Sequence, residues 1–422
     1  MTASVICRCS MLWRRRHARG KRLSSEVLGQ KVQSFKVKKV QRSKFSVTVC
    51  LPLVTGHEWL SDCLFFSQQQ EAKIFEPLIA LEPGTFDAEM LMPVNPEDFT
   101  VTQETFDSIH ACWRDARHAL KWDCLFVLPG WLKVWWDQFA GNQKAYLCAV
   151  RHQDELIGIA PLMLNEKTAR LIGDPDVCDF LDVITAPGNG RVFFENLVPH
   201  LKKRDITHLD FGAVREDSTV YRDLLAVARD LRYEVVCDPV DVTMELALPA
   251  TWDDFLYQLT AKERHEIRRK LRRLNEAARV TFRIVEDPHE VGKAVDTFVA
   301  LFKRNRADKS EFMTDQRASF FRALAGEMAA AHILKLFFLD LDDRPAAAVM
   351  CFDFESTVYL YNNGYDLRHK ALSVGLLSKV FTIKDSIQRG KNRYDFLKGT
   401  ESYKRRLGGK PIQLYRCRID IR

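Results

Sequence analysis

The sequence predicts an α/β protein that contains two copies of one domain behind a basic N-terminal tail. An apolar run, a polar turn and a second apolar run occupy residues 146–164, and the pattern recurs at 336–352, about 189 positions later. A helix pattern and a strand that ends in Asp-Phe occupy residues 192–211 and recur at 376–396, about 185 positions later. An internal repeat of this length indicates a duplicated domain rather than a solenoid.

The repeat and the charge distribution divide the chain into residues 1–97, 98–250 and 251–422. Residues 1–48 hold 13 Lys or Arg and a single acid, so they carry +12 of a whole-chain charge of +7. The tail is acid-poor and weakly periodic, which predicts a disordered extension or an over-extended translation start, with a transit peptide as the alternative. The remaining residues carry −5, which argues against a protein that binds nucleic acid through its bulk charge.

Composition and motifs exclude several other classes. No apolar run reaches the roughly 18 residues that a membrane span needs. The 11 cysteines are scattered, and Cys7 and Cys9 have no second pair at zinc-ligand spacing, so we expect no metal site and reduced thiols in a cytoplasmic protein. The sequence also lacks a Gly-x-Ser-x-Gly elbow, a phosphate-binding loop and a His-Glu-x-x-His motif.

The first copy contains an aromatic helix whose role stays open. Phe106, Ile109 and Cys112 recur at helical spacing, and a second helix is predicted after Pro129-Gly130. Along that second helix, residues 131, 135 and 139 are aromatic and fall four apart, so they share one face. This face either packs in the core or walls a substrate cleft.

A basic helix is predicted between the two copies, within residues 251–279. Thr251 is a suitable helix cap, and Ile267, Leu271 and Leu274 form one apolar stripe. Eight Lys, Arg or His side chains lie between Lys262 and Arg273 on the other faces. The basic face is either solvated or an anion-binding rim for a pantetheine phosphate or an RNA backbone.

Near the end of the second copy, a buried strand leads into a cationic turn at residues 394–408. An apolar run that contains Asp395 meets Gly399, and Tyr403-Lys404 follows with two further arginines. A pocket that stabilises a developing oxyanion needs a fixed ammonium group and nearby donors on a strand end.

This segment resembles the closing motif of the BioF2-like (CelD-like) acyltransferases, a branch of the GNAT superfamily related to the FemABX aminoacyl transferases. The residues that match the motif are Asp395, Phe396, Leu397, Gly399, Glu401, Tyr403, Lys404 and Gly408, and the departures are Thr400 and Leu407. The resemblance covers about residues 98–420. It implies two tandem GNAT-like domains, with mixed sheets flanked by helices.

The resemblance also implies roles for residues of the second copy. Lys404 would polarise the acyl carbonyl, and Tyr403 would orient Lys404 or donate a proton. Glu401 would act as a base, and Asp395 would hold a lysine or accept a proton from the substrate. Each of these four residues also has a purely structural interpretation.

The donor and acceptor sites are expected just before the helix of the second copy and beside its preceding strand. In GNAT folds the donor diphosphate rests on backbone N–H groups where a strand opens into a helix. The corresponding residues are Ser373, Val374, Gly375 and Leu376, although the usual GNAT glycine signature is absent. Tyr361, Asn362 and Asn363, which follow a strand predicted at 358–360, are expected to bind the acceptor.

The sequence therefore predicts direct transfer of an acyl group, typically acetyl, from an acyl-CoA co-substrate, with no permanently bound cofactor. The acceptor would be an amine or hydroxyl on a small molecule or on a cell-envelope or polysaccharide-related compound. One alternative is a FemABX-like transferase that uses aminoacyl-tRNA, for which the basic helix would serve. Another is a non-catalytic binding protein on the same fold, suggested by the two departures and the missing glycine signature. The acyl chain and the oligomeric state stay open.

Overall fold

The computed structural model of the chain describes residues 38–42, 45–49, 98–305 and 307–422, which belong to two compact units, residues 1–90 and 91–422. In the first unit, β1 (Lys38–Arg42) and β2 (Phe45–Val49) form an antiparallel two-stranded ribbon. The sequence predicts a disordered tail here, and the ribbon differs from that expectation because β2 is rich in β-branched residues. The rest of the predicted tail lies outside the described residues.

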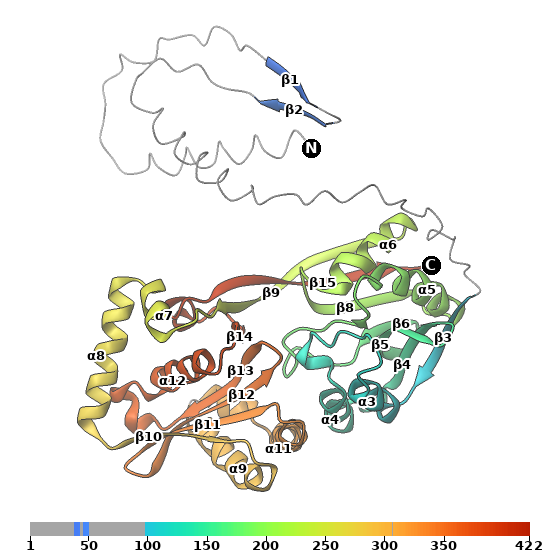
Figure 1. The fold of residues 1–422 in the computed structure, drawn as a ribbon. Coiled ribbons are helices and arrows are strands. Elements are labelled where there is room, and N and C mark those ends of the chain that lie inside the picture. The colour runs from blue at the N-terminus through green and yellow to red at the C-terminus, as the bar shows by residue number, and fades with distance from the viewer. Residues whose placement is uncertain (1–37, 43–44, 50–97, 306) are drawn as a thin grey trace, which may run out of the picture. The chain divides into compact units, whose positions relative to one another are not determined.

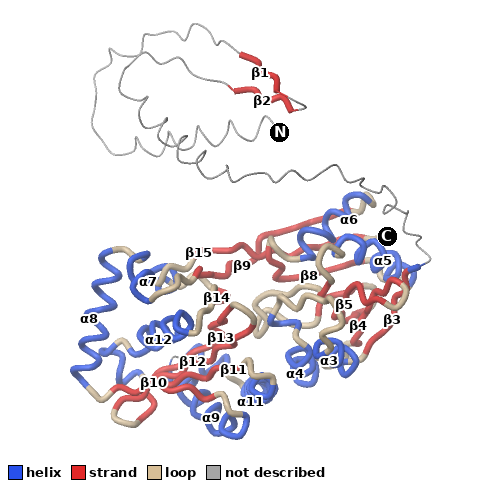
Figure 2. Tube along the Cα trace, in the orientation of Figure 1, coloured by secondary structure: helices blue, strands red, loops and turns tan. Residues whose placement is uncertain are grey.

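The second unit holds both copies of the repeat (Figures 1 and 2). The elements up to the end of the first copy are β3 (Phe99–Glu104), α3 (Phe106–Arg114), a 3-10 turn (Leu125–Val127), α4 (Pro129–Phe139), β4 (Lys144–His152), β5 (Glu155–Asn165), β6 (Thr168–Leu171), β7 (Ile184–Thr185), α5 (Gly190–Lys203), β8 (His208–Arg215), a π-helical turn (Val220–Leu224), α6 (Leu225–Asp230) and β9 (Glu234–Ala247). The elements that follow are α7 (Trp252–Gln258), α8 (Ala261–Ala277), β10 (Val280–Val285), α9 (Pro288–Asn305), α10 (Ala307–Phe312), α11 (Asp315–Ala330), β11 (Leu334–Leu341), β12 (Arg344–Phe354), β13 (Thr357–Tyr365), a 3-10 turn (Leu367–Leu372), α12 (Val374–Gln388), β14 (Arg393–Lys398), α13 (Ser402–Arg406) and β15 (Lys410–Asp420).

The strand pairing confirms that the domain is duplicated. In the first copy, β4, β5 and β6 are antiparallel neighbours, α5 follows, and β8 returns parallel to β6. In the second copy, β11, β12 and β13 are antiparallel neighbours, α12 follows, and β14 returns parallel to β13. Each copy is therefore a mixed sheet with a crossover helix between its parallel strands. The division at residue 250 stays a prediction.

The two copies exchange their last strands. The strand order is β10-β11-β12-β13-β14-β9-β15-β8-β6-β5-β4-β3, so one continuous sheet runs through both copies. β15, from the second copy, pairs with β8 of the first, whereas β9, from the first copy, pairs with β14 of the second. Because β9 and β15 also pair with each other, each copy's sheet depends on a strand that the other copy supplies.

The helices cover both faces of the second copy's sheet. Figure 1 shows α12 on one side of β11–β13 and α9 and α11 on the other. Side chains from α7, α8 and α12 form one apolar core, while α9 and α11 share a second core with the first copy. The aromatic face of α4 lies in this second core, where Trp131 is fully buried and its ring centroid lies 5.2 Å from that of Tyr361. The core interpretation of that face is confirmed.

Several boundaries differ slightly from the expected ones. α4 begins at Pro129 itself, because the missing N–H of proline is tolerated in the first turn. β13 continues to Tyr365 and includes the three residues that were expected to follow it. Five of the seven cysteines in the described residues are buried, and the cytoplasmic location stays a prediction. Among the described helices, none has the length and apolar character to cross a membrane.

Candidate functional site

The candidate site lies where β13 and β14 separate. The two parallel strands are in register only from Thr357 opposite Arg393 to Tyr359 opposite Asp395. Beyond this point β14 continues alongside β9 and β13 continues toward the turn that precedes α12. The strand pair therefore opens at Asp395, the residue that the motif places at the strand end.

β14 leaves regular strand geometry directly after Asp395. Leu397 has φ +59°, a left-handed conformation that is uncommon for a non-glycine residue. Asp395 stabilises this conformation because its Oδ1 accepts a hydrogen bond from the Leu397 N–H at 2.7 Å. The carboxylate of the motif thus fixes the bend that starts the β14 turn, residues 397–404.

Lys404 closes the same turn from inside. Its side chain is 3% exposed, and its Nζ donates to the carbonyl oxygens of residues 397, 398 and 399 and lies 3.0 Å from Glu401 Oε2. An ammonium group has three N–H bonds, so these four acceptors account for all of them. Lys404 is buried, and its donors point at its own turn rather than into open space.

The other motif residues pack around this turn. Glu401 is exposed and contacts Lys404, while the Tyr403 ring meets Phe396 edge-on at 6.3 Å between centroids. Burial raises the pKa of Tyr403, so its hydroxyl stays protonated at neutral pH. The structure therefore brings Asp395, Glu401, Tyr403 and Lys404 together in one small region.

Lys379 on α12 is a member of this region that the sequence reasoning missed. Its Nζ donates to Asn363 Oδ1 at 2.9 Å and to the Gly375 carbonyl at 2.7 Å, and it lies 4.9 Å from the centre of the Tyr403 ring. Burial, together with the nearby positive charge of Lys309, lowers the pKa of Lys379 to about 7. A lysine within the apolar run 374–383 of a predicted helix was the available signal.

The three residues expected to bind the acceptor have different surroundings on β13. Tyr361 lies at a register shift in the β12–β13 pair and is buried, and its hydroxyl donates to the Val177 carbonyl at 3.0 Å. Asn363 accepts hydrogen bonds from Lys379 and Lys309. Asn362 is partly exposed. Tyr361 is thus engaged by the first copy, whereas Asn363 faces the lysines of the second.

A loop of the first copy covers the place where β13 and β14 separate. In addition to the Tyr361 contact with Val177, Asp179 Oδ2 accepts the Lys398 N–H at 2.9 Å. Burial raises the pKa of Asp179, while the hydrogen bond from Lys398 opposes that shift. The two copies therefore meet at the site itself, and the first copy is part of it.

The amino end of α12 carries the residues expected to bind the donor. Ser373 adopts φ +59° immediately before the helix, and its Oγ accepts a hydrogen bond from Lys270 Nζ at 2.7 Å. A Cβ on Gly375 would lie 2.6 Å from the Tyr365 ring, so this glycine is needed for ring packing. Val374, Gly375 and Leu376 form the first turn of α12, where N–H groups commonly lack intrahelical acceptors. The Leu376 N–H donates to the Ser373 carbonyl at 3.0 Å, which leaves the N–H groups of Val374 and Gly375 for a ligand.

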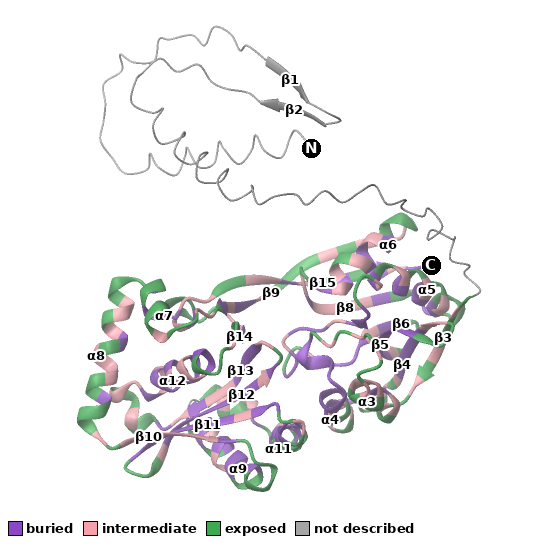
Figure 3. Cartoon of the chain, in the orientation of Figure 1, coloured by how far each residue is buried: buried purple, intermediate pink, exposed green. Residues whose placement is uncertain are grey.

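Lys270 comes from α8, the basic helix predicted between the copies. Ile267 and Leu274 are buried, and Figure 3 shows the rest of the helix largely exposed. Lys270 is held by Glu266 at 3.2 Å as well as by Ser373. One basic residue of α8 therefore points at the amino end of α12, where the helix dipole also favours an anion.

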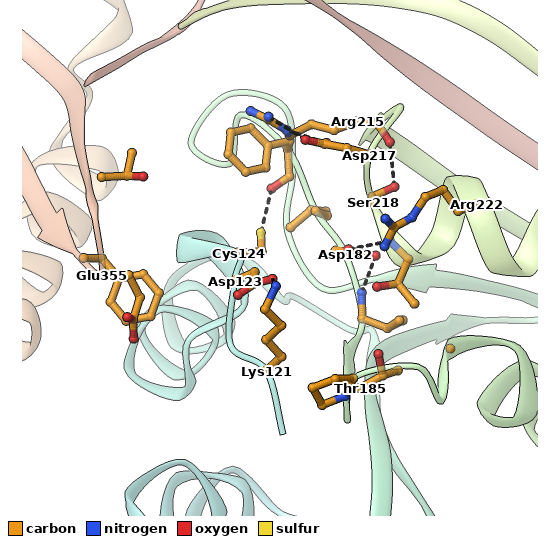
Figure 4. Close-up of a pocket in the computed structure, with 18 of the residues that line it drawn as sticks. Lys121, Asp123, Cys124, Asp182, Thr185, Arg215, Asp217, Ser218, Arg222 and Glu355 are labelled. Atoms are coloured by element: carbon orange, nitrogen blue, oxygen red, sulfur yellow. Dashed lines mark hydrogen bonds and ion pairs between the residues drawn. The ribbon is translucent and has the colours of Figure 1, made fainter. Parts of the chain in front are cut away.

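A cavity of about 940 Å³ opens on the first copy's side of Asp395. Its lining comes from residues 181–190 and 215–223 of the first copy and from the β12–β13 turn and β14 of the second. Figure 4 shows Glu355 of the second copy on one side, with Asp182 and Asp217 of the first copy on the other. Asp395 belongs to the lining, whereas no residue of the α12 amino end does.

Charged groups surround Asp395 at the edge of this cavity. The carboxylate is 1% exposed, and its Oδ2 lies 3.6 Å from Arg215, which also binds Asp217 and Glu245. Burial raises the pKa of Asp395 to about 7, and the attraction of Arg215 limits the rise. Asp395 can therefore gain or lose a proton near neutral pH. Within the described residues, no group of three or more His, Cys, Asp or Glu side chains is arranged to hold a metal ion.

This arrangement can be compared with known proteins. Residues 261–405 match the sequence model of the acetyltransferase (GNAT) domain. No curated protein matches the chain. The structure is similar to the crystal structure of FemX, with a TM-score of 0.52 and 12% identity over 75% of this chain and 96% of that one. It is also similar to a conserved protein of unknown function from Bacteroides thetaiotaomicron VPI-5482, with a TM-score of 0.49 and 13% identity over 76% of this chain and 99% of that one.

The chain folds as two tandem GNAT-like domains. The matched segment begins at the first residue of α8 and ends one residue after Lys404, so it contains both the amino end of α12 and the β14 turn. The fold and this domain support an acyltransferase, without naming its donor or its acceptor.

Proposed function

We propose that the protein is an acyltransferase that holds an acyl-CoA donor at the second copy and transfers the acyl group to an amine or hydroxyl. The supporting observation is the geometry around the amino end of α12. This helix follows the strand that separates from its parallel partner, and Lys270 is placed at Ser373 beside its first turn. Backbone N–H groups and one fixed ammonium are suited to a diphosphate.

In this proposal Asp395 takes the proton that the nucleophile loses. It lies where β13 and β14 part, it borders the cavity, and burial raises its pKa to about 7. A base with a pKa near the working pH is effective in proton transfer. Lys379, whose pKa burial lowers to about 7, would bind the acyl oxygen beside Asn363, which it already contacts.

Lys404 becomes a positioning residue in this proposal. It fixes the carbonyl groups of the β14 turn, and through that turn it holds Asp395 and Tyr403 in place. Glu401 supports Lys404 through its contact at 3.0 Å. The motif Asp-Phe-Leu-x-Gly-x-Glu-x-Tyr-Lys supports assignment to the BioF2-like group, because each of its polar members contributes to this one turn.

The first test is titration of the full chain with coenzyme A. We expect Lys270→Ala to weaken binding about tenfold, because it removes the ammonium that contacts Ser373 directly before α12. Lys262→Ala is the matched control, since Lys262 is an exposed lysine in the first turn of the same helix. Equal affinity in the wild type and in both variants would remove the proposed donor site.

The alternative donor is an aminoacyl-tRNA, as the resemblance to FemABX transferases implies. The observation that favours it is α8, which carries seven Lys or Arg against three Glu and is largely exposed. Nucleic-acid affinity falls steeply with salt, because binding releases counterions from the phosphates. Titration with tRNA and with coenzyme A across a salt series separates the two donors, and the acyl-CoA proposal requires tight coenzyme A binding at physiological salt.

The purified full chain also serves to test a non-catalytic role on the same fold. Thermal unfolding with acetyl-CoA reports binding, because a ligand that binds the native state raises Tm. Release of free coenzyme A with an added acceptor reports turnover. Binding without release, over a panel of small amines, hydroxyl compounds and cell-envelope or polysaccharide fragments, would favour the non-catalytic alternative.

A further inference from the structure

The cavity occupies, in the first copy, the position that the donor end occupies in the second. Residues 181–190 lead from β6 to α5, as residues 366–373 lead from β13 to α12. Residues 215–223 follow β8, as residues 398–402 follow β14. Residues 181–190 and 215–223 both line the cavity, so the cavity lies at the amino end of α5, the first copy's counterpart of the amino end of α12.

The amino ends of α5 and α12 differ in the charge of the side chain beside them. In the second copy, Lys270 contacts Ser373 beside α12. In the first copy, the Asp223 carboxylate lies against Gly190, the first residue of α5, where any side chain on that glycine would collide with it. Asp182, also in the lining, accepts the N–H groups of Thr219 and Val220. Carboxylates therefore occupy the places at which the first copy would bind an anion.

The remaining lining is acidic as well. It contains seven Asp or Glu side chains against four Lys or Arg. Arg215, Arg393 and Lys121 are each paired with a carboxylate of the same lining. Among the described residues, no ion pair involves Glu355, which extends from the β12–β13 turn into this lining. The cavity therefore presents an excess of negative charge from both copies.

Tyr359 supplies a polar group that lacks a partner in this cavity. Its side chain is 7% exposed and lines the cavity beside Asp395. Among the described residues no hydrogen bond is formed by its hydroxyl, and the hydroxyl is not one of the fully enclosed polar atoms, so it is open to a ligand in the cavity. Burial raises the pKa of Tyr359, so it is a neutral phenol that can donate and accept.

We propose that this cavity is the acceptor site and that the acceptor is a small, flexible compound with more than one primary amine. This inference rests on the proposed function and names the substrate class of that site. The carboxylates attract the ammonium groups, and the Tyr359 hydroxyl binds the nitrogen that reacts. Asp395, which also lines the cavity, faces the same nitrogen.

The transfer step balances with the groups present. The reacting ammonium first loses one proton to solvent. The neutral amine then attacks the thioester carbonyl, so that a C–N bond forms and the C–S bond breaks. Asp395 takes the second proton from nitrogen and the thiolate of coenzyme A recovers it, which leaves an amide and a free thiol. No oxidant or metal enters the balance.

The test uses the full chain titrated with putrescine, a four-carbon diamine, and with succinate, a four-carbon dianion. We expect putrescine to bind and succinate not to bind. Tyr359→Phe and Glu355→Gln should each weaken putrescine binding about fivefold, because each removes one polar contact and keeps the shape. Matched controls are Tyr257→Phe, at a tyrosine that is 78% exposed on α7, and Glu290→Gln, at an exposed residue of α9, and each should change the affinity less than twofold.

Each outcome decides the inference separately from the proposed function. Absence of putrescine binding, succinate binding of equal strength, or unchanged affinity in both cavity variants would overturn the amine site. Coenzyme A titration of the same variants should be unchanged, because neither residue lies at the α12 end. Loss of coenzyme A binding in the wild type would instead overturn the proposed donor, whatever the result with putrescine.

Discussion

The two copies share one strand order but differ in what they place at the end of the crossover helix. In the first copy, Asp223 covers the start of α5 and the neighbouring cavity is acidic. In the second, Lys270 approaches the start of α12, and the adjacent turn is filled by Lys404. In our proposals the two equivalent helix ends bind ligands of opposite charge, an anion at α12 and a cation at α5, without a change of fold.

The largest effect is expected when the β14 turn loses its internal ammonium. Lys404→Met leaves three buried or partly buried carbonyl groups without a donor and keeps the side-chain length. We expect the free energy of unfolding to fall by about 3 kcal/mol, as measured by chemical denaturation. Arg405→Met is the control, because Arg405 is exposed in the same helix. A fully stable Lys404→Met protein that has lost turnover would show that the lysine acts on substrate instead.

The next effect concerns Asp395, which lines the cavity. Asp395→Asn keeps the acceptor for the Leu397 N–H but cannot take a proton. We expect kcat to fall about 100-fold with coenzyme A affinity unchanged, since general-base catalysis contributes about that much. An Asn variant as active as the wild type would exclude Asp395 as the base.

Gly190 and Gly375 lie in the first turns of α5 and α12, and their substitution should have different costs. Gly375→Ala brings a Cβ within 2.6 Å of the Tyr365 ring, whereas Gly190→Ala meets the side chains of Asp223 and Thr219. We expect a cost of about 2 kcal/mol at Gly375 and about 1 kcal/mol at Gly190, because a packed ring moves less easily than a carboxylate. Denaturant unfolding of the two variants gives the order, and a reversed order would show that the Asp223 side chain cannot move aside.

The last effect is a slope in stability with pH. Burial raises the pKa of Asp395 to about 7, above its value in an unfolded chain. Between pH 4 and 7 the folded protein therefore binds more protons at this site, and its stability decreases as the pH rises, by about 1.4 kcal/mol per pH unit. Arg215 opposes this shift, while Glu245 and Asp179 increase it.

The slope is measured by comparing wild type with Asp395→Asn from pH 5 to pH 7. Asp182, whose pKa burial raises to about 6, contributes in the same direction in both proteins and cancels in the difference. The Asn variant should gain stability relative to the wild type as the pH rises. A constant difference across this range would mean that Asp395 is already ionised in the folded state.

The repeat was predictable from the sequence because each hairpin and each Asp-Phe strand end leaves a local pattern. Helix α8 and its buried stripe were predictable for the same reason, since Ile267 and Leu274 follow helical spacing. The exchange of β9 and β15 was not, because strand pairing depends on contacts between residues about 180 positions apart in the chain. β9 is also largely exposed along its first half, so it lacks the alternating pattern of a buried strand.

The sequence predicted where the motif residues lie, but not what each residue does. Sequence alone placed Asp395 and Lys404 together, and the structure shows them on one turn. It could not show that the ammonium of Lys404 is directed at its own backbone, because that depends on the left-handed bend at Leu397. Lys379 and Tyr359 were missed because a lysine in an apolar helix and a tyrosine in an apolar strand read locally as packing.

The interlaced strands β9 and β15 constrain how the chain reaches its native state. β15 follows every other described strand in the chain, yet it fills the gap between β8 and β9. During synthesis, therefore, β8 and β9 each have an unpaired edge until β15 leaves the ribosome. Such edges can pair with other nascent chains. A premature stop before residue 410 would make that exposure permanent in both halves at once.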